Sequence, residues 1–257
     1  MQKLILVKVG GKVVENPDSL SSLLKHFSAI KGPKVLIHGG GRSATALAKQ
    51  MGIETKMVNG RRITDNQMLK IVTMVYGGLV NKNIVARLQS IGINALGLTG
   101  ADLNYMEAVK RPVKDIDYGF AGDITKVNVE VLCPLVEQNI VPVLSPLSHD
   151  GKGQILNTNA DTIAAEAAIA FSKYFQTELI YCFEMPGVMK NPEDKTSVIP
   201  NLNLKEFKEY QKQGIINAGM IPKLDNSFRA LSKGVSIVRI TNIEGLESGG
   251  TILKTKF

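Results

Sequence analysis

The residues Ile5-Leu6-Val7-Lys8-Val9-Gly10-Gly11 form a short apolar run that ends in two glycines, and the pattern returns at Val35-Leu36-Ile37-His38-Gly39-Gly40-Gly41. Runs of this kind are typical of strands in a parallel sheet that turn directly into a helix. Because glycine has no Cβ, its N–H can approach an anion closely, and a helix that begins just beyond adds a positive dipole end. One such turn alone is as easily explained by the fold, because glycine is common in any tight turn from a strand to a helix. Two of them, with Lys8 beside the first, predict a phosphate site.

The composition is that of a globular chain. Of its 257 residues, 44% are hydrophobic and 21% charged, and this length suits one α/β domain with a single sheet. No apolar run approaches the roughly 18 residues of a membrane span, so we expect no membrane partner. The start of the chain has no signal-peptide pattern, which favours a cytoplasmic location. Cys133 and Cys182 form no metal-ligand spacing, so we expect two buried thiols and no metal site.

The net charge of +8 is compatible with nucleic-acid binding, but the lysines and arginines are scattered and aromatic residues make up only 5% of the chain. We therefore expect no nucleic-acid partner. The positive charge favours small polyanions instead, such as a nucleoside triphosphate and a carboxylate substrate.

Strands and helices alternate along the chain, which is the signature of parallel βαβ units. The apolar patterns predict strands at 3–9, 34–38, 95–98, 141–144, 178–182 and 236–240, and helices at 18–30, 43–51, 65–88, 128–138, 161–171, 204–213 and 221–233. Asn59-Gly60 predicts a hairpin over 56–63, and further hairpin-like pieces are expected over 105–127. The proline-containing segment 185–201 is expected to be a surface loop.

The predicted helix 65–88 has two notable features. Thr64, followed three residues later by Gln67, predicts a capping box at its start. The helix is also too apolar for a single buried stripe, which predicts one face toward the core and one toward a second copy of the chain. The apolar residues are Met68, Leu69, Ile71, Val72, Met74, Val75, Leu79 and Val80.

The segment Asn157-Thr158-Asn159-Ala160-Asp161 places three short polar side chains at alternating positions. In an extended backbone these side chains would point to one side and converge. A helix cap at the start of the following helix is the alternative. A calcium loop does not fit, because Thr162 and Ala168 stand where an EF-hand needs Gly and Glu.

Lys223 lies near the start of a predicted helix, after Gly214, Gly219 and Pro222. A lysine there opposes the helix dipole, which is more easily explained if an anion lies close by. Lys8 and Lys223 thus form a candidate pair that clamps one phosphoryl group. No histidine looks catalytic: His38 is expected to be a hydrogen-bonded structural residue, and His26 and His149 show no partner pattern.

Five motifs in this order resemble those of the acetylglutamate kinases in the amino-acid kinase family: Lys8-Val9-Gly10-Gly11, His38-Gly39-Gly40-Gly41, Asn59-Gly60-Arg61-Arg62-Ile63-Thr64, Asn157-Thr158-Asn159-Ala160-Asp161 and Gly219-Met220-Ile221-Pro222-Lys223. The resemblance spans nearly the whole chain. It implies a three-layer αβα sandwich with a mainly parallel open sheet. It also implies an N-terminal lobe, about 1–175, for the acyl-amino acid and the dimer contact, and a C-terminal lobe, about 176–257, for ATP.

The activity implied is the transfer of a phosphoryl group from ATP, with Mg²⁺ carried by the nucleotide, to the γ-carboxylate of N-acetyl-L-glutamate, the second step of arginine biosynthesis. Position by position, the resemblance implies that Lys8 and Lys223 hold the phosphoryl group and that Asp161 holds both lysines. Gly40, Gly41, Arg62, Asn157 and Asn159 would bind the substrate. Gly10, Gly11, Glu184, Gly187, Gly219 and Met220 would contact the nucleotide or its phosphoryl group.

This role needs no catalytic base. A γ-carboxylate is already ionised at neutral pH, so the difficulty is the repulsion between two anions. Lysines, glycine N–H groups and Mg²⁺ reduce that repulsion.

Three stretches depart from the family pattern. Cys182-Phe183-Glu184-Met185-Pro186-Gly187 has Glu184 where aspartate is usual, which leaves the adenosine contacts open. Gly97-Leu98-Thr99-Gly100-Ala101-Asp102 and Phe120-Ala121-Gly122-Asp123 also differ, beside the expected acyl site. N-succinylglutamate is therefore an alternative substrate, and its extra carboxylate would need a cation from Arg61, Lys110, Arg111 or Lys114.

Several kinases of the same family share part of this pattern. Glutamate 5-kinase, aspartokinase, carbamate kinase and uridylate kinase have the glycine turns and the lysines, and a non-catalytic amino-acid sensor could have the same fold. Because arginine-inhibited family members have an N-terminal helix and this chain begins with a strand at about residue 3, we expect a homodimer that is insensitive to arginine.

Overall fold

A single eight-stranded sheet forms the centre of the molecule in the computed structural model, which describes residues 1–58, 60–191, 193–216 and 220–255. The strand order is β12 (Asn201–Leu202), β14 (Thr251–Leu253), β13 (Ile237–Thr241), β11 (Gln176–Cys182), β1 (Lys3–Val9), β2 (Lys34–His38), β8 (Val141–Leu144) and β5 (Ala95–Leu98). Neighbouring strands are parallel except β13 and β14. The predicted mainly parallel open sheet is confirmed.

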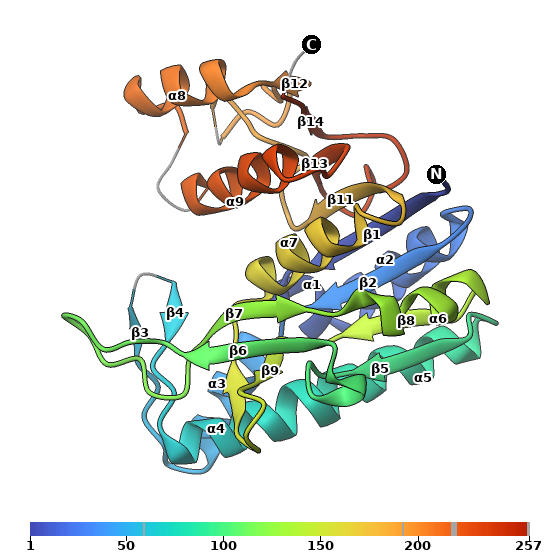
Figure 1. Cartoon of the computed structure of the whole chain (residues 1–257). Helices are drawn as coiled ribbons and strands as arrows, with labels where there is room; N and C mark the ends of the chain where they lie inside the picture. The colour runs from blue at the N-terminus through green and yellow to red at the C-terminus, as the bar shows by residue number, and fades with distance from the viewer. Residues whose placement is uncertain (59, 192, 217–219, 256–257) are drawn as a thin grey trace.

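Helices cover both faces of this sheet (Figure 1). One face packs against α1 (Gly11–Glu15), α2 (Pro17–Ala29), α3 (Gly41–Gln50), α4 (Asn66–Val72), the π-helix η1 (Thr73–Val80) and α5 (Asn81–Ser90). The other packs against α6 (Cys133–Glu137), α7 (Ala160–Phe171) and α9 (Ile221–Ser232), with α8 (Leu204–Lys212) on α9. Side chains alternate across a strand: Leu4 and Leu6 of β1 join the α7 layer, and Val7 and Val9 the opposite one. Lys8 therefore faces the α7 layer.

Smaller strands extend from one end of the central sheet. A second sheet has the order β10 (Ile155–Asn157), β9 (Leu147–His149), β6 (Met106–Lys110) and β7 (Gly122–Val127), and β3 (Met57–Val58) pairs with β4 (Arg61–Arg62). Figure 1 shows β3, β4, β6 and β7 together on one side of the molecule. The predicted hairpin 56–63 is present as β3 and β4, although Asn59 lies outside the described residues. The two- and three-residue strands β9, β10, β12 and β14 were not predicted, because so few residues carry no periodic signal.

Two helix predictions need correction. The capping box of Thr64 and Gln67 is wrong: the cap is Asp65, whose Oδ1 accepts from Met68 N at 2.8 Å. Thr64 lies before the cap and donates through Oγ1 to Arg62 O at 3.1 Å. The predicted helix 128–138 is divided into the 3₁₀ helix η3 (Val129–Val131) and α6. Pro134 explains the division, because proline has no N–H and fits only the first turn of a helix.

The apolar helix after residue 65 runs through α4, η1 and α5. Of the eight apolar residues on which the dimer prediction rests, six are buried within the monomer: Met68, Leu69, Ile71, Val72, Val75 and Val80. Met74 and Leu79 are exposed, at 51% and 56%. The monomer core therefore accounts for most of the apolar surface that predicted a dimer face, and only these two residues are left for such a face.

Candidate active site

The two glycine turns lie side by side. β1 and β2 are adjacent parallel strands with Val9 opposite His38, so both turns leave the same edge of the sheet. Gly39 N donates to Val9 O at 3.2 Å, and Gly10 N donates to Cys182 O at the end of β11 at 3.0 Å. Beyond β1 the chain crosses to β2 on one side, and beyond β11 it crosses to β13 on the other. Such a reversal at the carboxyl ends of parallel strands forms a crevice suited to ligands.

Backbone amides gather at this crevice. The nitrogens of Gly40 and Gly41 lie 3.8 and 3.9 Å from the position that a Cβ on Gly11 would take. Among the described residues, none accepts a hydrogen bond from the N–H of Gly11, Gly40 or Gly41. Gly41 is also the first residue of the ten-residue helix α3, whose dipole favours negative charge at that end. This group of amides is suited to an anion.

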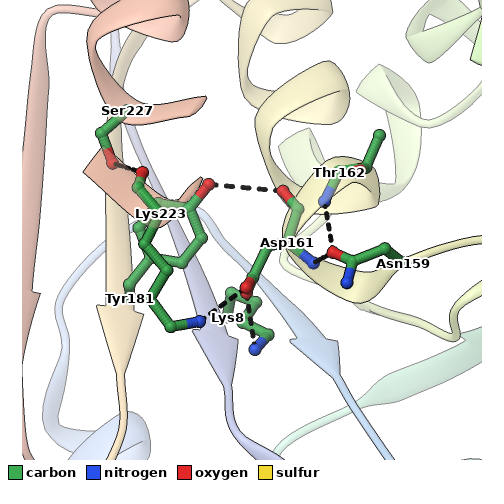
Figure 2. Close-up of polar contacts among 7 residues, drawn as sticks. All are labelled: Lys8, Asn159, Asp161, Thr162, Tyr181, Lys223 and Ser227. Atoms are coloured by element: carbon green, nitrogen blue, oxygen red, sulfur yellow. Dashed lines mark hydrogen bonds and ion pairs between the residues drawn. The ribbon is translucent and has the colours of Figure 1, made fainter. Parts of the chain in front are cut away.

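Two lysines share one carboxylate (Figure 2). Lys8 Nζ lies 2.6 Å from Asp161 Oδ1, and Lys223 Nζ lies 2.6 Å from Asp161 Oδ2. Lys8 comes from β1, Asp161 from the first turn of α7 and Lys223 from the first turn of α9. The side chains are 10%, 16% and 23% exposed. We call these residues the lysine clamp, and its net charge is +1.

Burial and the ion pairs act in opposite directions on the clamp. Burial alone would raise the pKa of Asp161, but the attraction of Lys8 and Lys223 outweighs it and holds that pKa well below its usual range. Burial lowers the pKa of Lys8, which Asp161 partly offsets and Lys223 reinforces. The Asp161 carboxylate therefore compensates the charge of Lys223 at the helix start.

Only the first half of the segment 157–161 is extended: Asn157 ends β10, the backbone of Asn159 is extended, and α7 begins at Ala160. Asn159 caps the helix: its Oδ1 accepts from Asp161 N at 2.9 Å and Thr162 N at 3.2 Å (Figure 2). Asn157 donates through Nδ2 to Thr64 Oγ1 at 2.9 Å. Asn157 and Asn159 line one cavity, as the predicted convergence requires, but the Asp161 carboxylate contacts Lys8 and Lys223 instead. The cap has a different consequence, since it fixes the turn from which Asp161 reaches the lysines.

A cavity of about 170 Å³ borders the clamp. Its walls are Gly39, Gly40, Gly41, Met57, Gly60, Arg61, Arg62, Tyr76, Ala121, Pro146, Asn157, Thr158, Asn159 and Ala160. Of the predicted substrate residues, Gly40, Gly41, Arg62, Asn157 and Asn159 all line it. Arg62 is buried, and its Nη2 donates to Gly41 O at 2.7 Å and Thr45 Oγ1 at 2.8 Å.

One rim of this cavity is basic. Arg61 lines the cavity, and burial, followed by repulsion from Arg111, lowers its pKa. Arg61 forms no ion pair with a described residue, whereas Arg111 donates through Nε to Asp123 Oδ1 at 3.1 Å. Lys110 and Lys114 are exposed and are not among the lining residues. Of the four cations considered for an acyl carboxylate, only Arg61 reaches the cavity.

The predicted nucleotide residues lie around the end of β11. Glu184 is largely exposed and pairs with Lys12 Nζ at 3.0 Å. Gly187 and Met220 line a small apolar cavity of about 40 Å³, together with Met185, Val188, Met189, Ile215 and Ile216. A Cβ on Gly187 would lie 2.7 Å from Thr251 Oγ1, so glycine is required there for packing. Gly219 lies outside the described residues.

The histidines and cysteines are not part of the lysine clamp. His38 is a buried, hydrogen-bonded residue, as predicted. His26 and His149 make contacts outside the site, with Glu247 Oε1 at 3.3 Å and Gly151 N at 3.1 Å. Cys182 is buried as expected, but Cys133 is partly exposed. The described residues contain no group of three or more His, Cys, Asp or Glu side chains that could hold a metal ion.

Sequence reasoning missed residues that hold others in place. Tyr76 of η1 lines the cavity, and its ring lies where a Cβ on Gly40 would approach Cδ1 to 2.9 Å. Tyr181 of β11 donates through its hydroxyl to Asp161 O at 3.3 Å. Thr45 and Thr64 hold Arg62 and Asn157. A tyrosine before Gly77-Gly78 in an apolar helix was a weak signal for Tyr76, since a buried hydroxyl needs a polar neighbour.

Residues 3–242 match the model of the amino acid kinase family. The chain belongs to this family. An acetylglutamate kinase from Phocaeicola vulgatus is 61% identical over 254 residues, which cover 98% of this chain and 99% of that protein. The structure of smu.665 from Streptococcus mutans UA159 is 26% identical with a TM-score of 0.80, covering 98% of this chain and 99% of that one. Giardia lamblia carbamate kinase bound to AMP-PNP has a TM-score of 0.69 at 12% identity, with 99% of both chains covered, and so shares the fold.

In the described part of this family member, no helix is both long and apolar enough to cross a membrane.

Proposed function

We propose that this amino acid kinase transfers the γ-phosphoryl group of ATP to the γ-carboxylate of an N-acylated glutamate, with N-acetylglutamate as the first candidate. The observation that carries the proposal is the lysine clamp beside the amides of Gly11, Gly40 and Gly41. Family membership and relatives named acetylglutamate kinase support the same chemistry. The product would be an acyl phosphate, the activated form from which a carboxylate can be reduced in arginine biosynthesis.

The reaction needs charge compensation rather than proton transfer. A carboxylate oxygen of the substrate forms a bond to phosphorus, the bond from the γ-phosphorus to the bridging oxygen breaks, and ADP leaves with that electron pair. Both reactants are anions, and positive groups around the transferring phosphoryl lower the barrier. Lys8 and Lys223 supply those charges, and Asp161 holds them on one side of the path. Asp161 itself is an organiser, because its low pKa makes it a poor base.

The cavity lined by Arg62 suits the acylated amino acid. A guanidinium donates strongly to a carboxylate. Arg62 Nη2 gives its two N–H groups to Gly41 O and Thr45 Oγ1, which fixes the plane of the group, so a carboxylate binds as a fork by replacing one of these acceptors. We assign the α-carboxylate to Arg62 and the acylated nitrogen to Asn157. The γ-carboxylate would then point toward Gly40, Gly41 and the clamp.

The nucleotide belongs on the opposite side of the clamp. We assign residues 1–175 to the acylglutamate lobe and 176–257 to the ATP lobe, with Gly187 and Met220 beside the base. Mg²⁺ enters with the phosphates as part of the substrate, since the described side chains offer no cluster for it and Asp161 is taken up by the lysines.

The experiment is a hydroxamate assay. The protein is incubated with Mg·ATP, hydroxylamine and either N-acetylglutamate, N-succinylglutamate, glutamate or aspartate. Hydroxylamine traps acyl phosphate as a coloured hydroxamate. Product with an N-acylglutamate but not with glutamate or aspartate is the expected result. Product with free glutamate alone would replace the proposal by a glutamate 5-kinase, and no product with any acid would favour a non-catalytic sensor.

Arg61 favours a second candidate, N-succinylglutamate. Its half-buried guanidinium lines the cavity without an ion pair among the described residues, so it is available to a ligand carboxylate. On this proposal, Arg61→Gln loses activity with the succinyl substrate roughly 10-fold or more, the cost of one charged hydrogen bond, and changes the acetyl reaction little. The control is Lys114→Gln, an exposed cation outside the cavity. Equal losses on both substrates would remove the succinyl proposal.

We further propose a homodimer that acts in the cytoplasm. The exposed Met74 and Leu79 on η1 supply an apolar surface for the second copy. The two free thiols fit a reducing compartment.

A further inference from the structure

A buried histidine contacts the second glycine turn through the carbonyl of Gly39. His38, the last residue of β2, is fully buried, and its Nδ1 lies 2.6 Å from the carbonyl oxygen of Gly39. A carbonyl oxygen can only accept a hydrogen bond. Nδ1 must therefore carry the proton and donate.

The other ring nitrogen is fixed independently. Asn81, the buried first residue of α5, places Nδ2 2.9 Å from Val143 O and 3.1 Å from His38 Nε2. Because Val143 O only accepts, the atom facing it is the amide nitrogen, which therefore also donates to Nε2. Nε2 is then an acceptor without a proton. Burial lowers the pKa of His38 to about 4, so the ring is neutral at physiological pH.

This fixed tautomer orients the glycine turn. The C=O of Gly39 and the N–H of Gly40 belong to one planar trans peptide and point in opposite directions, and the described chain contains no cis peptide. With its carbonyl held by His38, the Gly39–Gly40 peptide directs the Gly40 N–H away from the ring. Gly40 N lies on the open side of Gly11, where no described residue accepts from it.

We propose that His38 is a positioning residue, which with Asn81 and Val143 O holds the Gly39–Gly40 peptide so that the Gly40 N–H donates to the anion in the site. Val143 lies on β8. Three hydrogen bonds, from Asn81 to Val143 O, from Asn81 to His38 and from His38 to Gly39 O, thus connect this strand to the Gly39–Gly40 peptide. The proposal rests on the proposed function for the identity of that anion. The orientation of the peptide does not depend on it.

The first test reads the tautomer directly. In protein labelled with ¹⁵N-histidine, the His38 resonances should show a protonated Nδ1 and an unprotonated Nε2, with no change between pH 6 and pH 8. A protonated Nε2, or a charged ring in that range, would overturn the proposal. This measurement needs neither substrate nor activity, so it separates the positioning role from the proposed kinase function.

The second test uses a matched pair of variants. Asparagine places an amide nitrogen near the position of Nδ1, whereas glutamine reaches the position of Nε2. His38→Asn can thus keep the bond to Gly39 O and loses the contact with Asn81, and His38→Gln does the reverse. If His38 were only structural, His38→Asn and His38→Gln would lose activity to a similar degree, in proportion to their losses of Tm.

We expect His38→Gln to lower kcat/KM for the acylglutamate by roughly 10- to 100-fold, the cost of misplacing one group in a reacting geometry. His38→Asn should stay within about 3-fold of the wild type, because its donor to Gly39 O is retained. Wild-type activity in His38→Gln, or a loss in His38→Asn as large as that in His38→Gln, would overturn the proposal. If neither variant folds, the tautomer measurement on the wild type decides. If the wild type phosphorylates no acylglutamate, the proposed function fails. The tautomer measurement then still tests the positioning role of His38, because it does not depend on activity.

Discussion

At the scale of single residues, one carboxylate determines the state of two lysines. Asp161 Oδ1 and Oδ2 each lie 2.6 Å from an ammonium group, and all three side chains are mostly buried. Without the carboxylate, Lys8 and Lys223 would repel each other away from bulk water. The shared carboxylate reduces the free-energy cost of burying two positive charges at the site.

Asp161→Asn should therefore destabilise the protein by about 3 kcal/mol at pH 7, since it leaves two buried cations uncompensated. The pKa of Asp161 is lower in the folded protein than its unfolded value of about 3.9. Its stabilising contribution is thus complete above that unfolded value and is lost as the pH falls toward the folded pKa. Urea unfolding of both proteins should show their difference shrinking below about pH 4. The exposed Asp115→Asn is the control, and a difference independent of pH would contradict the account.

A second prediction at this scale concerns Gly40. A Cβ there would lie 2.9 Å from Tyr76 Cδ1, so Gly40→Ala must displace the ring from the cavity wall. We expect a rise in the acylglutamate KM of roughly 10-fold with little change in the ATP KM, because only one pocket is deformed. Adding Tyr76→Leu should recover much of the loss. If the double variant is as weak as Gly40→Ala, the ring is not the cause.

Some of these residues were predictable from sequence and some were not. Lys8 and Lys223 stand out because a cation beside a glycine turn or at a helix start is chemically unusual, and Asp161 stands out through the resemblance of its motif. Tyr76 and Thr45 were missed, because their relevance depends on which helix packs over the glycine turn. The cap at Asn159 was only one of two interpretations, because an alternating polar pattern does not distinguish an extended segment from a cap.

At the scale of elements, the loop after β11 and the strand β14 depend on each other. Thr251 Oγ1 accepts from Val188 N at 2.8 Å and donates to Ile199 O at 2.6 Å. Gly187 permits this close packing, since its Cβ would lie 2.7 Å from Thr251 Oγ1 and 2.8 Å from Val198 Cγ1. The contact shapes the small apolar cavity assigned to the nucleotide base.

Gly187→Ala should consequently affect ATP more than the acylglutamate. The loop must move away from Thr251, and we expect the ATP KM to rise roughly 10-fold while the acylglutamate KM stays nearly constant. Initial rates with each substrate varied in turn measure this split. A change confined to the acylglutamate KM would contradict the assignment of the two lobes.

The long strands and helices were predictable because their period is strong, and strands 3–9, 34–38, 95–98 and 141–144 match β1, β2, β5 and β8 residue for residue. The π-helix η1 was not, because a register of i to i+5 leaves no distinct apolar period in eight residues. Pro134 is a signal that the predicted helix 128–138 is divided, but the apolar pattern on both sides of it is continuous and predicted one helix.

At the scale of the whole molecule, the proposed assembly depends on two exposed side chains. Most of the apolar residues of the long helix are buried within the monomer, and Met74 and Leu79 remain. Leu79→Glu would place a charge in the proposed contact, so we expect light scattering to show a shift from dimer to monomer. Met51→Glu, at a 54% exposed methionine on α3's C-terminal side, should leave the dimer unchanged. A wild-type monomer or hexamer would refute the homodimer.

Lys8→Ala shows whether the lysine clamp acts on the transferring phosphoryl group. The measurement is hydroxamate formation from Mg·ATP and N-acylglutamate by the variant and the wild type, with unfolding followed in parallel to show that both are folded. Loss of a charged group aimed at the transition state predicts a rate lower by about 100-fold or more. A folded Lys8→Ala protein with the wild-type rate would contradict the account.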